Sequence, residues 1–138
     1  MGTRADFYIG RGPEAEWLGS IAYDGYPDGI ETTILDATTP KKFRAAVAKF
    51  LKERDDSTFP DQGWPWPWED SRTTDYAYAF DGGAVLASRM GHQWAATGDV
   101  DNGDGPKMGP EAFPNMKSRQ NVRLDRGSGV MILALPRK

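Results

Sequence analysis

The sequence predicts an α+β protein in which a largely antiparallel sheet of about five or six strands packs against one main amphipathic helix. Paired runs of alternating apolar and polar residues, joined by turn residues, are typical of β-hairpins. Only one stretch, 40–53, repeats its apolar residues at helical spacing. A chain of 138 residues suits one hydrophobic core and is short for two, so we expect a single domain over 1–138.

The first two strands are expected over 3–10 and 16–23. Phe7 and Ile9 alternate with polar or small residues in the first stretch, which places them on one face of a strand. The intervening residues 11–13 contain glycine and proline and predict a turn. A hairpin is the simplest pairing of these two strands.

The main helix is predicted over 40–53. Thr39 precedes it as a candidate cap, and Pro40 suits the first helical position, where no backbone N–H is needed. The apolar positions recur three and four residues apart and define one buried face; they are Phe43, Ala46, Val47, Phe50 and Leu51.

A second hairpin is expected from strands at 74–80 and 84–90, joined by an Asp-Gly-Gly turn at 81–83. The segment 92–97 is a candidate to extend the sheet. Residues 130–135 form a short apolar run that is stopped by a proline, as expected of a central strand buried on both faces.

Two stretches, 55–73 and 98–120, are expected to be irregular because they are rich in Pro, Gly, Asp and Asn. Long irregular segments are uncommon in compact domains, and they often carry binding loops.

The net charge of −3 conceals strong segregation along the chain. Residues 1–36 carry a net charge of −5 and residues 55–111 a net charge of −8. The basic charge lies in 37–54 and 112–138, each with a net charge of +5. If these two blocks share a face, they would attract an acidic or phosphate-bearing partner. The alternative is a solvated helix flank and a charged tail.

The composition excludes several classes of site. With no cysteine and one histidine, the chain cannot hold a disulfide, a zinc knuckle, an iron–sulfur cluster, a thiol nucleophile or a multi-histidine metal site. We therefore expect no cofactor. No apolar run approaches the roughly 18 residues that span a bilayer, and no signal sequence is evident, so we expect a cytoplasmic protein with no membrane partner.

Residues 24–29 read Asp-Gly-Tyr-Pro-Asp-Gly and contain two turn signals around a tyrosine. One interpretation is a simple chain reversal after the second strand. The other is a binding loop, because Tyr26 between Asp24 and Asp28 is suited to stack on a base or to hold a cationic group.

The start of the chain resembles a widespread group of small phage and prophage proteins. Those proteins begin with a Thr-Arg strand and carry a His-Trp-Asp-Gly-Tyr-Pro signature. The matching positions here are Thr3, Arg4 and the run Asp24, Gly25, Tyr26, Pro27, while Ala22 and Tyr23 replace the His-Trp pair. The similarity covers about the first 30 residues and implies a phage or prophage origin, with no assigned chemistry.

Trp64, Trp66 and Trp68 alternate with prolines in the most unusual stretch of the sequence. Prolines at this spacing forbid a helix and favour extended or polyproline II backbone, in which we expect that three indoles cannot all face one small core. The segment is either a lid packed over the edge of the sheet or a surface that contacts another protein, since tryptophan is enriched at interfaces.

The acidic run Asp99–Gly105 resembles a calcium loop but is one residue out of register with the EF-hand pattern. An exposed turn is the alternative. His92, the single histidine, can act as a general base, although such a base needs an orienting carboxylate and a nucleophile or water nearby. A histidine with a single structural hydrogen bond is the alternative.

The leading hypothesis is a phage or prophage accessory protein that binds a host protein without catalytic turnover. Inhibition of a defence or host-takeover target is one way in which such binding would act. Its expected contact residues are Asp24, Tyr26, Asp28, Trp64, Trp66 and Trp68. One alternative is a small-molecule or nucleotide binder, in which Tyr26 or a tryptophan stacks on a base and phosphate is neutralised by Lys41, Lys42 and Arg44. Another is a small hydrolase that uses His92.

Overall fold

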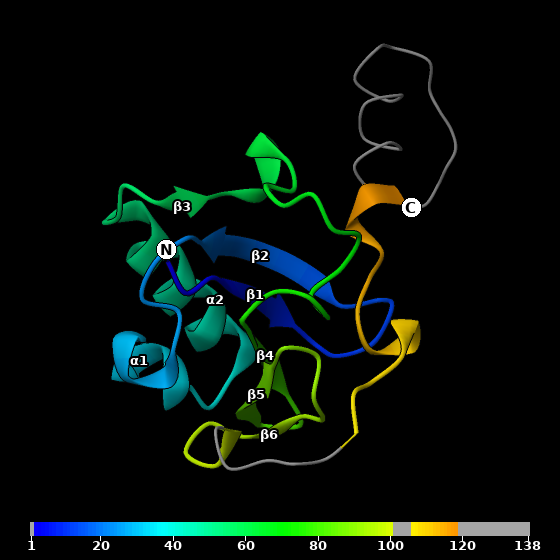
Figure 1. Cartoon of the computed structure of the whole chain (residues 1–138). Coiled ribbons are helices and arrows are strands. Elements are labelled where there is room, and N and C mark those ends of the chain that lie inside the picture. Colours follow the sequence, from blue (N-terminus) through cyan, green and yellow to red (C-terminus); the bar gives the residue numbers. More distant parts are fainter. Residues whose placement is uncertain (1, 101–105, 119–138) are drawn as a thin grey trace.

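The computed structural model describes residues 2–100 and 106–118, and its central feature is a six-stranded sheet (Figure 1). The strands lie in the order β3-β2-β1-β4-β5-β6. Strands β1 and β4 pair in parallel, and all other neighbours are antiparallel. The predicted α+β class is confirmed. The strands are β1 (Ala5–Ile9), β2 (Glu16–Ile21), β3 (Ser57–Thr58), β4 (Tyr76–Asp81), β5 (Ala84–Arg89) and β6 (Ala95–Ala96).

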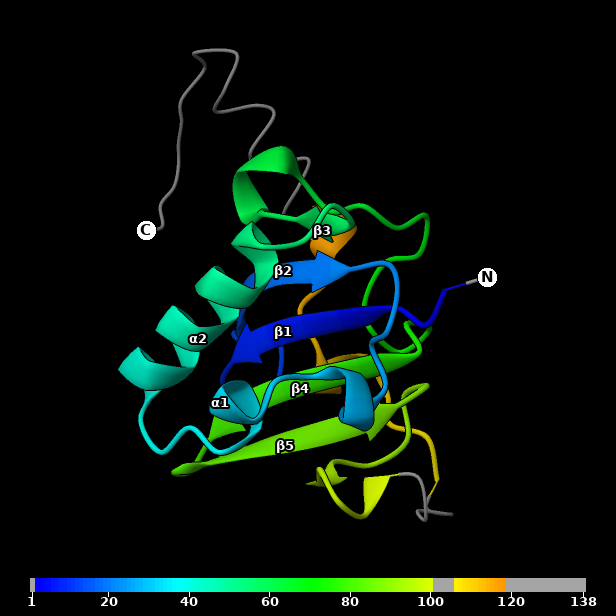
Figure 2. The same cartoon turned by 90° about the vertical axis from the view of Figure 1, so that its left-hand side faces the viewer.

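Two helices lie on one side of this sheet (Figure 2). The longer, α2 (Pro40–Lys52), confirms the predicted helix; its cap, Thr39, accepts a hydrogen bond through Oγ1 from the backbone N–H of Lys42 at 3.1 Å. The short α1 (Thr32–Leu35) was not predicted. Single 3-10 turns occur at 27–29, 60–62 and 110–112.

The first hydrophobic core fills the space between the helices and the sheet. Phe7 lies at its centre, with its ring stacked on Tyr78 and edge-on to Phe50 of α2. Other large apolar side chains of this cluster come from both helices and from the three strands β2, β4 and β5: Leu18, Ile21, Ile34, Phe43, Val47, Leu51, Tyr76, Phe80 and Val85.

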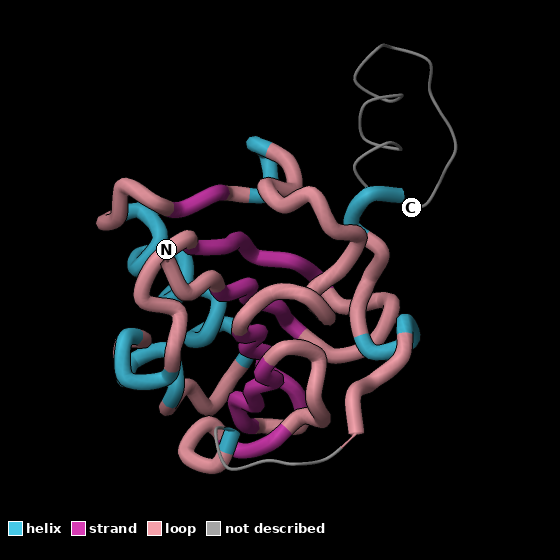
Figure 3. Tube along the Cα trace, viewed as in Figure 1, coloured by secondary structure: helices cyan, strands magenta, loops and turns pink. Residues whose placement is uncertain are grey.

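The parallel pairing of β1 with β4 requires a crossover, and this crossover covers the second face of the sheet. Residues 59–75 (the crossover segment) leave β3 at one edge and return to β4 at the centre, so they pass over β2 and β1. Figure 3 shows the segment mostly as loop, with one short 3-10 turn. The prediction of an irregular stretch at 55–73 missed the two-residue β3.

A second hydrophobic core lies under the crossover segment. The expectation that Trp64, Trp66 and Trp68 cannot all face one core is wrong: Trp64 belongs to this cluster, and the other two pack against it while remaining partly exposed. The chain bends from residue 66 to residue 70. With these bends the three indoles pack on the same side, whereas a continuous polyproline II backbone, with three residues per turn, would direct them to different sides. Other members of the cluster are Tyr8, Ala15, Trp17, Ala77, Ala79, Phe113 and Met116.

A bulge in β2 places two polar groups on this second face. The pairing of β1 with β2 shifts register between Phe7 and Tyr8. Gly19 occupies the irregularity with φ of 143°, and a Cβ at this position would crowd Leu51 and the carbonyl of Thr58. As a result Trp17 and Ser20 lie on the same side, and the indole N–H donates to Ser20 Oγ at 3.0 Å.

The later strands follow the prediction where the structure describes them. The hairpin of β4 and β5 is confirmed, and β6 extends the sheet within the expected 92–97. The predicted strand at 130–135, most of the Asp99–Gly105 loop and most of the second basic block lie outside the described residues. No helix among residues 2–100 and 106–118 is long and apolar enough to cross a membrane.

Candidate functional site

The loop that follows β2, residues Tyr23–Gly29 (the tyrosine loop), is where the described surface exposes large aromatic side chains. Tyr23 is 55% exposed and Tyr26 is 42% exposed, and no other large hydrophobic side chain in the described part of the chain is classed as exposed. Asp24 and Asp28 lie beside them and are also exposed. The loop therefore combines aromatic and acidic groups at the surface.

Close approaches of the backbone explain why residues 25 and 29 of the loop are glycines. Gly25 donates its N–H to the carbonyl of Thr3 at 2.8 Å, and a Cβ on Gly25 would lie 2.8 Å from the side chain of Ala5. A Cβ on Gly29 would overlap the carbonyl oxygen of Asp24, which itself has a φ of 62°. Both glycines are thus required by close backbone approach.

The loop is also tied to the first core from below. The Tyr78 hydroxyl donates to the carbonyl of Gly25 at 2.7 Å. Pro27 opens a single 3-10 turn, in which the N–H of Ile30 bonds back to the Pro27 carbonyl. Ile30 is buried among the helix-side apolar residues. The tyrosine loop is therefore anchored on the helix side of the sheet.

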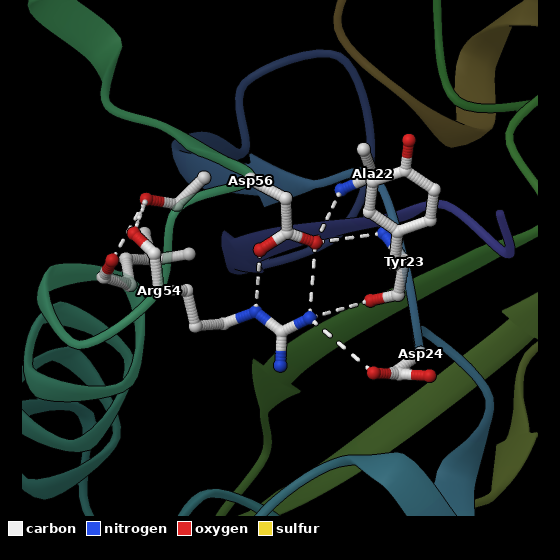
Figure 4. Close-up of polar contacts among 7 residues, drawn as sticks. Ala22, Tyr23, Asp24, Arg54 and Asp56 are labelled. Atoms are coloured by element: carbon white, nitrogen blue, oxygen red, sulfur yellow. Dashed lines mark hydrogen bonds and ion pairs between the residues drawn. The ribbon is translucent and has the colours of Figure 1, made fainter.

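A clamp at the end of α2 fixes the first residues of the loop (Figure 4). Asp56 Oδ2 accepts the backbone N–H groups of Ala22 at 3.1 Å and Tyr23 at 2.8 Å. Arg54 donates through Nη2 to the Tyr23 carbonyl at 2.8 Å and through Nε to Asp56 Oδ1 at 2.7 Å. Two charged side chains thus satisfy three backbone groups where β2 ends.

Asp24 is connected to the same clamp. Its Oδ2 lies 3.7 Å from Arg54 Nη2, and its Oδ1 accepts a hydrogen bond from the Tyr26 hydroxyl at 3.3 Å. Partial burial alone would raise the pKa of Asp56, but hydrogen bonds from Arg54 and from the Tyr23 backbone outweigh it and hold that pKa below its usual value. The hydrogen bond to Asp56 raises the pKa of Arg54.

The clamp predicts an acid-sensitive contribution to stability. Because the pKa of Asp56 is lower in the folded chain than its ordinary value of 3.8, the carboxylate stabilises the fold above that value and loses this effect as the pH falls through the folded pKa. We expect the free energy of unfolding to fall less between about pH 5 and pH 3 in Asp56→Asn than in the natural chain, as measured by urea denaturation. Asp61→Asn, at an exposed carboxylate, is the control; equal pH profiles for all three proteins would contradict the clamp.

The basic residues of α2 do not join the tyrosine loop. Arg44 makes a bidentate pair with Glu16, with distances of 2.6 and 2.8 Å between nitrogen and oxygen. Lys41 and Lys42 lie in the first turn of α2, whereas Arg54 follows its last turn, about 18 Å away at 1.5 Å per residue. The structure therefore does not place these cations beside Tyr26, as a site for a nucleotide stacked on that ring would require.

The three tryptophans named as contact residues direct their polar groups inward. Trp64 Nε1 donates to the carbonyl of Trp68 at 2.7 Å, and Trp68 Nε1 donates to Thr74 Oγ1 at 2.9 Å. Trp66 Nε1 donates to Asp6 Oδ1 at 2.7 Å. They pack on the face of the sheet opposite the tyrosine loop. The two predicted contact segments therefore do not form one surface.

Asp6 of β1 is a buried carboxylate that sequence reasoning missed. It is fully buried. Besides Trp66, its carboxylate accepts hydrogen bonds from Ser20 Oγ at 2.5 Å and Ser71 Oγ at 2.6 Å. Burial raises its pKa, and the hydrogen bonds from Ser20, Ser71, Thr74 and Trp66 oppose that shift.

Two aromatic side chains form hydrogen bonds to the serines that contact this carboxylate. The Trp17 indole donates to Ser20, and the Tyr8 hydroxyl lies 2.6 Å from Ser71 Oγ. The single proton of Ser71 points to Asp6, so the Tyr8 hydroxyl must be the donor in that pair. The donors converge on Asp6 and tie the crossover segment to β1 and β2.

His92 lacks the partners of a catalytic base in the described structure. Its Nδ1 lies 2.8 Å from the carbonyl oxygen of Arg89, so this nitrogen carries the hydrogen. No group of three or more potential metal ligands occurs among residues 2–100 and 106–118. The arrangement suits a histidine that terminates β5 by a local hydrogen bond.

Comparisons with protein-family models, with curated proteins and with solved structures find no match to this chain.

Proposed function

We propose that this chain is a binding protein that engages another protein through the tyrosine loop. The observation that carries the proposal is the exposure of Tyr23 and Tyr26 on a backbone fixed from both sides. The sequence resemblance suggests a phage or prophage origin, so the proposed partner is a protein of the host. Inhibition of a defence or host-takeover protein is the corresponding finer proposal.

The rest of the loop supports this interpretation. Its glycines, its proline and Asp24 all have structural roles in the turn. The rings of Tyr23 and Tyr26 lie largely outside both cores, although the Tyr26 hydroxyl also donates to Asp24. Tyrosine is enriched among the residues that dominate binding energy at protein interfaces. A loop that is already ordered also loses less conformational entropy on binding.

The test compares proteins captured from a bacterial lysate by matched variants. We expect at least one protein to be retained by the natural chain and lost with the double variant Tyr23→Ser, Tyr26→Ser, because the aromatic contact area is removed. The double variant Lys41→Ser, Lys42→Ser, exposed at the far end of α2, should retain it. Quantitative mass spectrometry measures the difference.

Thermal unfolding of each variant confirms that it is folded before capture. If every captured protein is retained equally by the tyrosine and lysine variants, the tyrosine loop is not the binding surface.

A further inference from the structure

Two arginines in the described part of the chain, Arg4 and Arg54, share one arrangement, in which a guanidinium lies over an aromatic ring and pairs with an aspartate. The guanidinium carbon of Arg4 lies 5.6 Å from the ring centre of Trp66 and 5.4 Å from that of Trp68. The same side chain lies 3.6 Å from Asp75 Oδ2. Arg4 thus combines a cation–π contact with an ion pair.

Arg54 repeats this arrangement. Its guanidinium carbon lies 5.0 Å from the ring centre of Phe50, and its Nε lies 2.7 Å from Asp56. Planar guanidinium groups suit both contacts, because the face of the group stacks on a ring while its edge bonds to a carboxylate. Two arginines from different parts of the chain therefore contact the same two kinds of partner, an aromatic ring and an aspartate.

The tyrosine loop contains an exposed aromatic ring and an exposed aspartate that have no such cation. Tyr26 and Asp28 are two residues apart on the same rigid turn, and both are exposed. Among residues 2–100 and 106–118, no cation lies over the Tyr26 ring and no side chain pairs with the Asp28 carboxylate. The segment 23–31 contains three acidic residues and no basic one.

We propose that Tyr26 and Asp28 bind an arginine side chain of the partner protein. This inference rests on the proposed function and specifies the chemistry of the partner. The guanidinium stacks on the Tyr26 ring and donates hydrogen bonds to Asp28, while Asp24 and Glu31 add negative charge around it. Arginine fits better than lysine, because an ammonium group cannot stack or bond in a bidentate manner.

The test uses three short peptides of equal length in which glycine alternates with arginine, lysine or citrulline. Lysine has the positive charge of arginine but no planar group, and citrulline has a planar urea group but no charge. We expect the arginine peptide to shift the backbone amide NMR signals of residues 24–29 of the natural chain. The affinities measured for the lysine and citrulline peptides should be weaker by about ten-fold or more.

Asp28→Asn and Tyr26→Leu should each abolish the shifts caused by the arginine peptide, whereas Glu14→Gln, at an exposed carboxylate before β2, should not. Equal binding of arginine and lysine peptides, shifts centred elsewhere, or no shifts at all would each overturn the proposal. A captured partner that is lost with the tyrosine double variant but kept by Asp28→Asn would overturn it too. In that last case, the proposed function would stand.

Discussion

Replacement of Asp6 by alanine is expected to lower the free energy of unfolding by about 3 to 5 kcal/mol. The carboxylate accepts hydrogen bonds from Ser20, Ser71 and Trp66 inside the protein. Each donor left without an acceptor in a buried site costs about 1 to 3 kcal/mol. Removal of the buried charge offsets part of this loss, because burial disfavours the ionised form.

The isosteric variant Asp6→Asn separates these two effects. It removes the charge but replaces one acceptor oxygen by an amide group that donates. Since the surrounding groups also donate, at least one contact becomes repulsive. We expect a loss smaller than that of Asp6→Ala and still measurable by urea denaturation at neutral pH.

The control for both variants is Asp28→Ala, at an exposed carboxylate in the tyrosine loop. It should leave the urea midpoint unchanged. In Asp6→Ala, the indole N–H signal of Trp66 should also move in NMR spectra, because that hydrogen bond is lost. An unchanged midpoint for Asp6→Ala would mean that the carboxylate does not hold the crossover segment in place.

The second large effect is expected for Trp64→Ala, which should cost about 3 to 5 kcal/mol of unfolding free energy. Trp64 is only 6% exposed. Its ring lies edge-on to Trp17 with 5.2 Å between ring centres, and its N–H bonds to the Trp68 carbonyl. Truncation opens a cavity and at the same time removes the donor that bonds to the partly buried Trp68 carbonyl.

Tyr23→Ala provides the matched control for Trp64→Ala, because it removes a large ring that is 55% exposed. It should change the unfolding free energy by no more than about 0.5 kcal/mol. Both variants are compared by urea denaturation at the same pH. If Tyr23→Ala costs as much as Trp64→Ala, the tyrosine ring has a structural role and the argument for a binding loop fails.

Local patterns predicted the elements that local contacts stabilise. The helix over 40–52 follows from apolar spacing and from Thr39, whose hydroxyl caps it as expected. The hairpin of β4 and β5 follows from alternation around a glycine turn. In both cases, the residues that decide the structure lie within a few positions of one another.

The parallel contact of β1 with β4 was not predictable in this way. Ala5 pairs with Tyr76, and no local pattern links residues so distant in sequence. The second core could not be predicted for the same reason, because it too depends on residues distant in sequence. Asp6 and Tyr8 alternate with Phe7, which on its own indicates a solvent-facing side of a strand. Asp6 and Tyr8 are buried because the crossover segment passes over their side of the sheet.

The candidate site was predicted in part. Asp24, Tyr26 and Asp28 are at the surface, but the clamp of Arg54 and Asp56 went unrecognised, because it joins residues about 30 positions apart. For the tryptophans, the sequence left open a lid packed over the sheet and a surface that contacts another protein. Their indole N–H groups find acceptors inside the chain, at Asp6, Thr74 and Trp68.

The parallel pairing of β1 with β4 also constrains how the chain folds. Arg4 and Asp75, which flank the paired strands, are 71 positions apart. Closing so long a loop costs entropy before any contact of β4 is gained, and folding rates fall as such distant contacts increase. During synthesis, the centre of the sheet cannot assemble until β4 has left the ribosome. Until then the tryptophans of the crossover segment lack Ala77 and Ala79 of β4 as packing partners, and apolar surface exposed in this way favours aggregation of incomplete chains.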